Sequence, residues 1–302
     1  MPNPGLAEEL AQGAFGVVGA AVWGALWGSF FNVVAARVPR GESLVRPPSH
    51  CRSCKAPVAW YDNVPVLSYL LLRGRCRRCG ARYSARYLLV ELLIAALAVL
   101  MHHVFVVRGE VPIGLRLGQF AVTSLFSGLL VAVALIDLDT LRIPDAITYP
   151  GIPTAVVLSL FMSLPHPWDG PVGGAAGYLL IRGIADGYRL ATGRLGMGYG
   201  DAKLLAMVGG LLGWQVLLPT IFLAAVQGSI IGIGALAIAR RRGADRPPVE
   251  PDATDDRSET TGDEELPLRH AAIPFGPFIS LAAIEVLVLR PWLPLFFPYL
   301  PW

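Results

Sequence analysis

Charge is scarce in this chain of 302 residues. Asp, Glu, Lys and Arg make up 16% of the sequence, while hydrophobic residues make up 54%. A soluble domain usually carries about a quarter of its residues as charged side chains. The shortage is concentrated in long windows without any charge, and the mean hydropathy is +0.54. This pattern indicates several membrane spans and not one soluble core.

The sequence also lacks signals that would point elsewhere. No Lys or Arg precedes the first apolar stretch, so the N-terminal region is expected to be a retained span and not a cleaved signal peptide. No glycine-rich loop follows a predicted strand, which argues against a dinucleotide-type cofactor fold. No internal repeat is apparent.

About eight candidate spans can be counted. A helix needs about 20 residues to cross the hydrocarbon layer. The candidate windows are 10–36, 92–107, 117–136, 146–168, 170–193, two within 204–239, and 270–289. A turn near Gly213–Pro219 is expected to separate the two helices within 204–239. The sequence therefore predicts an all-α polytopic membrane protein with about eight transmembrane helices.

The distribution of Lys and Arg predicts which span ends face the cytosol, because cytoplasmic loops carry an excess of these residues. If the first span runs from outside to inside, four loops become cytoplasmic and together hold 21 of the 25 Lys and Arg. These loops are 37–88, 137–146, 189–203 and 240–270. We therefore expect both termini outside. The basic residues are topological anchors in the lipid bilayer, so they do not indicate a nucleic-acid partner.

Two polar regions interrupt the membrane pattern. After a first transmembrane segment at 1–36, residues 37–88 carry all four cysteines and eleven basic residues. This length suits a small cytoplasmic subdomain but not a large core. The remainder, 89–302, is expected to be the membrane domain. Within it, residues 243–267 are rich in acidic residues and Pro, and they are expected to form a disordered cytoplasmic loop.

The four cysteines form two CxxC pairs. Cys51 and Cys54 are followed by Cys76 and Cys79. Two such pairs can complete a tetrahedral zinc shell, and their basic neighbours would favour thiolates. Four cysteine ligands leave no open position for water, so a structural zinc is favoured over a catalytic one. Two disulfides are the alternative, although the reducing cytosol argues against them.

Two aspartates occur at predicted cytoplasmic ends of spans. Asp137 follows the third span, and Asp201 precedes the sixth within the sequence GYGDAK. A carboxylate at the hydrophobic boundary is costly and often functional. Two such groups close together cannot both ionise easily, so one could activate water while the other protonates a carbonyl oxygen. The alternative is that Asp201, like Asp145, only favours the N-terminus of a helix.

The fifth span contains further unusual residues. Arg182 and Asp186 are four residues apart, so we expect a pair that faces a cavity or a neighbouring helix. Gly173 and Gly177 have the small-xxx-small spacing that favours close packing between helices.

Nine short stretches occur in order along the chain. They are GSFFNVVAARVPRGES at 28–43, PPSHC at 47–51, WYDNVPVLSY at 60–69, RGRC at 73–76, RYLLVE at 86–91, IDLD at 136–139, IPD at 143–145, GYGDAK at 198–203 and IPFGP at 273–277. Together these stretches resemble the prepilin peptidases. The resemblance covers about residues 24 to 285.

This resemblance implies an eight-helix aspartyl protease of the GxGD type in the bacterial inner (cytoplasmic) membrane, serving type IV pili or type II secretion. It implies cleavage of prepilins or pseudopilins after a glycine, at the end of a short basic leader. It further implies methylation of the new N-terminal amine from S-adenosylmethionine. By this resemblance Asp137 and Asp201 become the catalytic pair, with Asp139 as the main rival of Asp137. The cysteine subdomain resembles the zinc-binding portion of the family.

Two other functions stay open at this stage. Another GxGD-type intramembrane protease would cut helices within the bilayer, although such relatives lack a cysteine subdomain as a rule. A non-enzymatic, zinc-stabilised scaffold or transporter would use Arg182 and Asp186 and leave Asp137 and Asp201 structural. The sequence identifies neither the oligomeric state nor the residues that bind the methyl donor.

Overall fold

The computed structural model describes residues 5–193, 198–244 and 274–296. Their regular structure is helical apart from two isolated β-bridges, which confirms the all-α prediction. The helices are α1 (Leu6–Gln12), α2 (Ala14–Arg37), α3 (Leu67–Leu71), α4 (Ala85–His102), α5 (Ile113–Thr140), α6 (Asp145–Leu158), α7 (Asp169–Thr192), α8 (Tyr199–Leu212), α9 (Leu217–Ala244), α10 (Gly276–Leu289) and α11 (Leu293–Phe296).

Four helical stretches among the described residues are long and apolar enough to cross a membrane. They are Ala14–Arg40, Ala85–Val107, Ile113–Thr140 and Trp214–Ala235. Two shorter apolar helical stretches begin at Asp145 and at Gly276. α7 carries charged side chains, and α8 has 14 residues. The prediction of a multi-pass membrane protein is confirmed, and the count of eight spans stays a prediction.

The long uncharged window at 204–239 divides where the sequence indicates. α8 ends at Leu212, and Gly213 has a φ of 90°. Only glycine adopts such a conformation without strain. α9 begins at Leu217, four residues after Gly213, so the predicted turn is confirmed.

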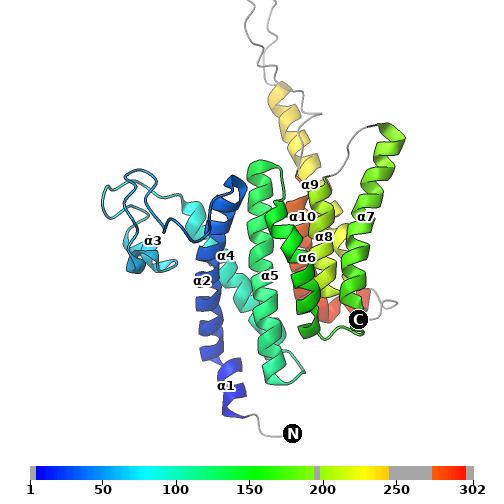
Figure 1. Ribbon diagram of the computed structural model, residues 1–302, viewed down its shortest axis with the longest axis horizontal. Coiled ribbons are helices and arrows are strands. Elements are labelled where there is room, and N and C mark those ends of the chain that lie inside the picture. The colour runs from blue at the N-terminus through cyan, green and yellow to red at the C-terminus, as the bar shows by residue number, and fades with distance from the viewer. Residues whose placement is uncertain (1–4, 194–197, 245–273, 297–302) are drawn as a thin grey trace, which may run out of the picture.

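The helices pack into a bundle in which α5 joins two groups. α5 contacts α2 and α4 on one side and α10 on the other (Figure 1). α8 lies among α6, α7, α9 and α10. Every residue of α8 from Asp201 to Leu212 is buried except Lys203. In the group formed by α6 to α10, the segment that starts with Asp201 is therefore the most enclosed part.

Glycines bring α7 and α8 into close contact. A Cβ at Gly173 would lie 2.2 Å from the carbonyl oxygen of Gly209, and a Cβ at Gly177 would lie 2.7 Å from that of Leu205. Real side chains essentially never come this near, so the backbones approach closely only because both positions are glycine. The packing role expected from the small-xxx-small spacing is confirmed.

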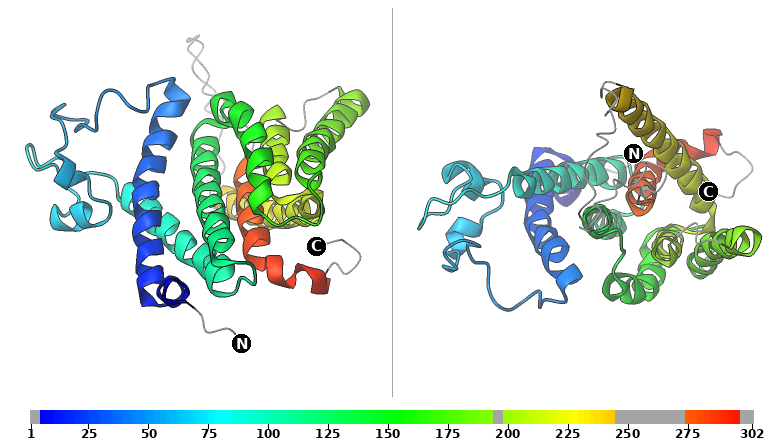
Figure 2. Two further views of the ribbon diagram at one scale, coloured as in Figure 1. Left: turned by 60° about the horizontal axis from the view of Figure 1, so that its bottom comes forward. Right: turned by 90° about the horizontal axis from the view of Figure 1, so that it is seen from above.

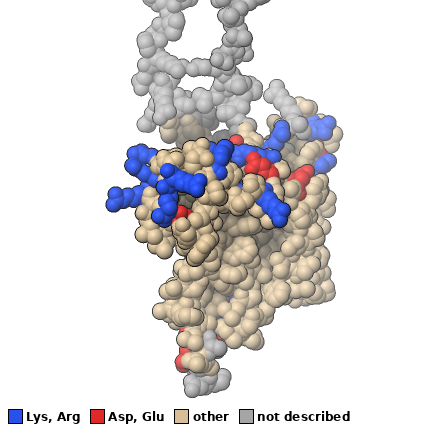
Figure 3. Space-filling model, turned by 60° about the vertical axis from the view of Figure 1, so that its left-hand side comes forward, with Lys and Arg blue, Asp and Glu red and all other residues tan. Residues whose placement is uncertain are grey.

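Basic side chains gather at one end of the molecule. Figure 3 shows Lys and Arg in a band across that end, while the surface below them is largely uncharged. The cysteine segment, between α2 and α4, projects from the side of the bundle beyond α2 (Figure 2). The predicted acidic loop 243–267 begins inside α9, which continues to Ala244, and the rest of that loop lies outside the described residues.

Candidate active site and metal centre

Asp137 lies in the last turn of α5 and is only 5% exposed. The helix ends at Thr140, where Leu141 turns the chain with a φ of 54° and donates its N–H to the carbonyl oxygen of Asp137. The side-chain carboxyl group accepts the backbone N–H of Gly276, at the start of α10. A Cβ on Gly276 would lie 2.5 Å from Oδ2 of Asp137. The α10 backbone can therefore reach this carboxyl group only because residue 276 is glycine.

Asp201 lies in the first turn of α8 and is 8% exposed. Its helix starts after Gly198, whose backbone forms a hydrogen bond with the Asp201 carboxyl group. A Cβ on Gly200 would lie 3.0 Å from Cβ of Ile143, and a Cβ on Gly276 would lie 3.0 Å from Cδ1 of the same isoleucine. Ile143 thus packs against both glycine-containing segments that carry or contact the two aspartates.

The structure brings Asp137 and Asp201 together. The charge of Asp137 acts on Asp201 through space, and the two residues come from α5 and α8, which are 64 residues apart at these positions. Both lie at ends of their helices, where they remain buried. Two buried carboxyl groups in electrostatic contact can share one proton between them. Such a pair can hold a water molecule and a carbonyl group for acid–base chemistry.

Asp139 faces a different environment. Its carboxylate accepts two hydrogen bonds from Arg86 of α4, at 3.0 and 2.7 Å, and its side chain is 50% exposed. Two residues along an α-helix correspond to a rotation of about 200°, so Asp137 and Asp139 point to nearly opposite sides of α5. The geometry separates the two aspartates and leaves only Asp137 beside Asp201.

Asp145 begins α6, as expected of a residue that starts a helix. Its carboxylate lies 2.5 Å from Nζ of Lys203, and Lys203 also lies over the ring of Tyr149 at 4.3 Å. Because Lys203 is only two residues from Asp201, this pair joins the start of α6 to the first turn of α8. The contact was not expected from the sequence, which gives no register between these two helices.

Arg182 and Asp186 form the pair that their spacing predicts, at 2.7 Å. The guanidinium group of Arg182 also lies over the ring of Tyr199, 4.1 Å from its centroid. Tyr199 is the second residue of the GYGD sequence, so Arg182 fixes α7 to the segment that carries Asp201. The contact faces a neighbouring segment, as expected.

The four cysteines form a cluster that could hold a metal ion. One sulfur atom from each lies within 4.8 Å of the other three, and the sulfur atoms of Cys51 and Cys79 are 3.8 Å apart. A zinc ion with four Zn–S bonds of about 2.3 Å holds its sulfur atoms about 3.8 Å apart. The spacing therefore suits a tetrahedral metal site, and all four cysteines are present as free thiols.

Two turns with the same hydrogen-bond pattern build this cluster. In each turn the N–H of the first cysteine bonds to the residue five positions later, and its carbonyl oxygen accepts an N–H from the residue four positions later. These bonds join Cys51 to Ala56 and Lys55, and Cys76 to Ala81 and Gly80. The two turns share the sequence pattern Cys-Arg-x-Cys-x-Ala, which extends the two CxxC pairs.

The turns also stabilise thiolates. Backbone N–H groups of Cys79 and Arg78 lower the pKa of Cys76 to about 6, and those of Cys54 and Ser53 lower the pKa of Cys51. A thiolate is the form that binds a metal ion. The first cysteine of each pair is thus prepared as a ligand by its own backbone.

Comparisons with known proteins match both parts of the chain. A model of the bacterial peptidase A24 N-terminal domain matches residues 22–105, and one of the type IV leader peptidase family matches residues 124–233. The prepilin leader peptidase/N-methyltransferase of Myxococcus xanthus (strain DK1622) is 35% identical over 90% of each chain. The protein of the same description from Klebsiella pneumoniae is 39% identical, over 67% of this chain and 87% of its own.

The chain belongs to the type IV leader peptidase family. The predicted family and the predicted enzyme class, prepilin leader peptidase/N-methyltransferase, are therefore confirmed. A further relative of this description, from Pseudomonas putida, is 33% identical over 89% of each chain. No solved structure matches the chain.

The two family models divide the site residues between them. The four cysteines fall within the A24 N-terminal match, and both buried aspartates fall within the leader peptidase match. Sequence reasoning missed the roles of Gly276 and Ile143. The signal for Gly276 was a glycine between prolines in IPFGP, but only the fold shows that it contacts Asp137.

Proposed function

We propose that this member of the leader peptidase family cleaves the leader of type IV prepilins or pseudopilins after a glycine, with Asp137 and Asp201 as the catalytic pair. It then methylates the new N-terminal amine, for which S-adenosylmethionine supplies the methyl group. The observation that carries the proposal is the pair itself. Two buried carboxyl groups from α5 and α8 interact at one end of the bundle.

The chemistry of the pair follows from its surroundings. Of two carboxyl groups this close, one keeps its proton and one is ionised. The ionised group takes a proton from water, which attacks the scissile carbonyl carbon. The protonated group donates its proton to the carbonyl oxygen, which gives a tetrahedral diol. The group that took the proton from water then passes it to the leaving amine as the C–N bond breaks, while the other group takes back a hydroxyl proton of the diol. The N–H of Gly276 fixes the orientation of Asp137, while Ile143 packs beside both glycine segments and keeps this end of the site apolar.

We propose that this chemistry takes place at the cytoplasmic membrane face. We propose eight spans, α2 and α4 to α10, with both termini outside the bacterial inner membrane. The end with the basic band then faces the cytosol, in agreement with the positive-inside rule. Residues 1–36 form the first transmembrane segment, 37–88 the cytoplasmic subdomain and 89–302 the membrane peptidase domain.

The cysteine subdomain holds structural zinc in this proposal. Cys51, Cys54, Cys76 and Cys79 provide a full set of four sulfur ligands at suitable separations. A complete shell leaves no position for water or substrate. The zinc therefore stabilises the two turns and takes no part in hydrolysis.

The first experiment incubates the purified chain with a leader-bearing prepilin and reads the product by mass. The wild-type enzyme should remove the leader, while Asp137→Asn and Asp201→Asn should not. Asp139→Asn is the matched control, since the same change two residues away should leave cleavage active. An added methyl mass that depends on S-adenosylmethionine establishes the second reaction.

The same experiment separates the other functions. A protease that cuts within the bilayer would cleave transmembrane helices and spare the leader junction. A scaffold or transporter that uses Arg182 and Asp186 would leave the prepilin intact in every reaction, with a folded enzyme. Either result would refute the proposed substrate.

A further inference from the structure

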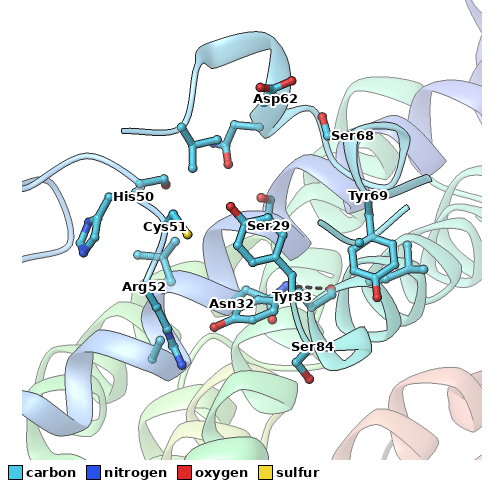
Figure 4. Close-up of a pocket in the computed structure, with 18 of the residues that line it drawn as sticks. Ser29, Asn32, His50, Cys51, Arg52, Asp62, Ser68, Tyr69, Tyr83 and Ser84 are labelled. Atoms are coloured by element: carbon cyan, nitrogen blue, oxygen red, sulfur yellow. Dashed lines mark hydrogen bonds between the residues drawn. The ribbon is translucent and has the colours of Figure 1, made fainter. Parts of the chain in front are cut away.

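A cavity of about 770 Å³ lies between the cysteine subdomain and the bundle. This volume falls within the range of about 300–1,000 Å³ that is typical of small-molecule sites. In Figure 4, Ser29 and Asn32 of α2 lie between His50–Arg52 on one side and Tyr69 on the other. The cavity is thus built by two parts of the protein that meet only in the folded chain.

Glu91 lines the inner part of this cavity and is 9% exposed. Its carboxylate accepts the backbone N–H of Val66 at 2.7 Å and interacts with the Ser29 hydroxyl group. Among the described residues, no Lys, Arg or His forms an ion pair with it. A buried carboxylate without a counter-charge is costly. Glu91 is therefore suited to a cationic ligand group.

The outer part of the cavity has the opposite charge. Arg52, Lys55 and Arg82 line it, and none of the three forms an ion pair with a described residue. Arg52 lies over the ring of Tyr87, with its guanidinium carbon 5.9 Å from the centroid. Such groups suit a ligand carboxylate, which Arg binds with paired hydrogen bonds.

Aromatic rings complete the lining. Tyr69, Tyr83 and Tyr87 all border the cavity, and flat rings provide stacking surfaces for a purine base. The ring of Tyr69 is held by the turn at Gly74, whose own Cβ would lie 2.7 Å from the tyrosine hydroxyl oxygen. The cavity thus combines an inner anion, an outer group of cations and aromatic faces.

We propose that this cavity binds the methyl donor of the N-methyltransferase reaction, a sulfonium nucleoside with an amino acid tail. This inference rests on the proposed function, which requires such a donor. Glu91 faces the cationic sulfonium or ammonium groups, the outer arginines hold the carboxylate, and a tyrosine ring stacks on the base. The inner carboxylate and the outer cations therefore match the charges of S-adenosylmethionine in sign.

The position of the cavity also suits this role. Tyr87 and Glu91 follow Arg86 on α4, and Arg86 is bonded to Asp139, two residues beyond Asp137 on α5. The donor cavity and the aspartate pair consequently lie at the same end of adjacent helices. An anionic lipid headgroup is a poorer occupant, because it would approach the unpaired carboxylate of Glu91.

The test measures donor binding directly, by equilibrium dialysis of radiolabelled S-adenosylmethionine with the full-length enzyme in detergent. Glu91→Gln should weaken binding by about tenfold or more, since a hydrogen bond or ion pair to a charged ligand group is lost. S-adenosylhomocysteine lacks the sulfonium charge, so its affinity should change less. Glu285→Gln is the matched control, because Glu285 lies in α10 and bonds to Gln227 at 2.6 Å.

Zinc content and thermal unfolding show whether each variant is folded. If Glu91→Gln does not fold, Arg52→Glu at the outer part replaces it and should weaken donor binding, with Arg78→Glu as the matched control outside the cavity. Unchanged donor affinity in a folded Glu91→Gln or Arg52→Glu variant would overturn the assignment. If a variant lost affinity equally for S-adenosylmethionine and for anionic lipid, the assignment would be overturned in favour of a lipid headgroup site. Failure of the wild-type enzyme to cut prepilin would instead count against the proposed function.

Discussion

Gly276 contacts Asp137 so closely that no larger residue fits at position 276. Its N–H donates to the carboxyl group, and a Cβ would lie 2.5 Å from Oδ2. The start of α10 therefore orients a buried aspartate that belongs to α5. This contact links a glycine between two prolines to the chemistry proposed for the aspartate pair.

Gly276→Ala should reduce leader cleavage by about 100-fold, because the added methyl group displaces the Asp137 carboxyl group from its position in the pair. The measurement is the initial rate of prepilin cleavage. Gly198→Ala is a matched control, since a Cβ there would lie 3.5 Å from Oδ2 of Asp201, an ordinary contact. Similar rates for the two variants would contradict the positioning role of Gly276.

Asp139→Asn should leave leader cleavage within a few-fold of the wild-type rate. The Arg86–Asp139 pair is about half exposed on both sides, so its loss should cost about 0.2–1 kcal/mol of unfolding free energy. Cleavage rate and thermal unfolding are measured on the same preparation. If cleavage were abolished with the fold intact, Asp139 and not Asp137 would belong to the catalytic pair.

Metal analysis should find one zinc ion for each chain. Cys76→Ser should lose the metal, because it removes a buried ligand whose thiolate is stabilised by backbone N–H groups. Arg78→Ala, an exposed change within the same turn, should retain it. Zinc-free wild-type protein prepared without chelators would contradict the structural metal site.

Gly173→Ala should destabilise the bundle by about 1–3 kcal/mol, because its Cβ would lie 2.2 Å from the backbone of α8. Gly183→Ala, on the same helix, meets nothing within 4 Å. It should be neutral or stabilising by up to about 1 kcal/mol, through helix propensity. Unfolding in detergent compares the two variants, and equal stability would show that the close approach of α7 and α8 is not needed.

Residue type and local spacing explain which features could be predicted from the sequence. Uncharged windows predicted the helices because a lipid environment excludes charge, and Gly213 marked the break before α9 because few other residues adopt its φ. The paired CxxC motifs indicated a metal site by ligand type alone. Arg182 and Asp186 could be paired because a helix brings residues four apart together.

Contacts between helices were beyond the reach of the sequence. The sequence alone does not distinguish Asp137 from Asp139, and only the packing of α4 on α5 pairs Arg86 with Asp139. The approach of Gly276 to Asp137 and the cavity around Glu91 depend on helix register and rotation, which one chain does not encode in any local pattern. The sequence by itself determined the helices, the candidate metal ligands and the candidate acids, since these follow from residue type and spacing. The tertiary structure decided which acids meet and which cavity forms, because those follow from the packing of segments far apart in the chain.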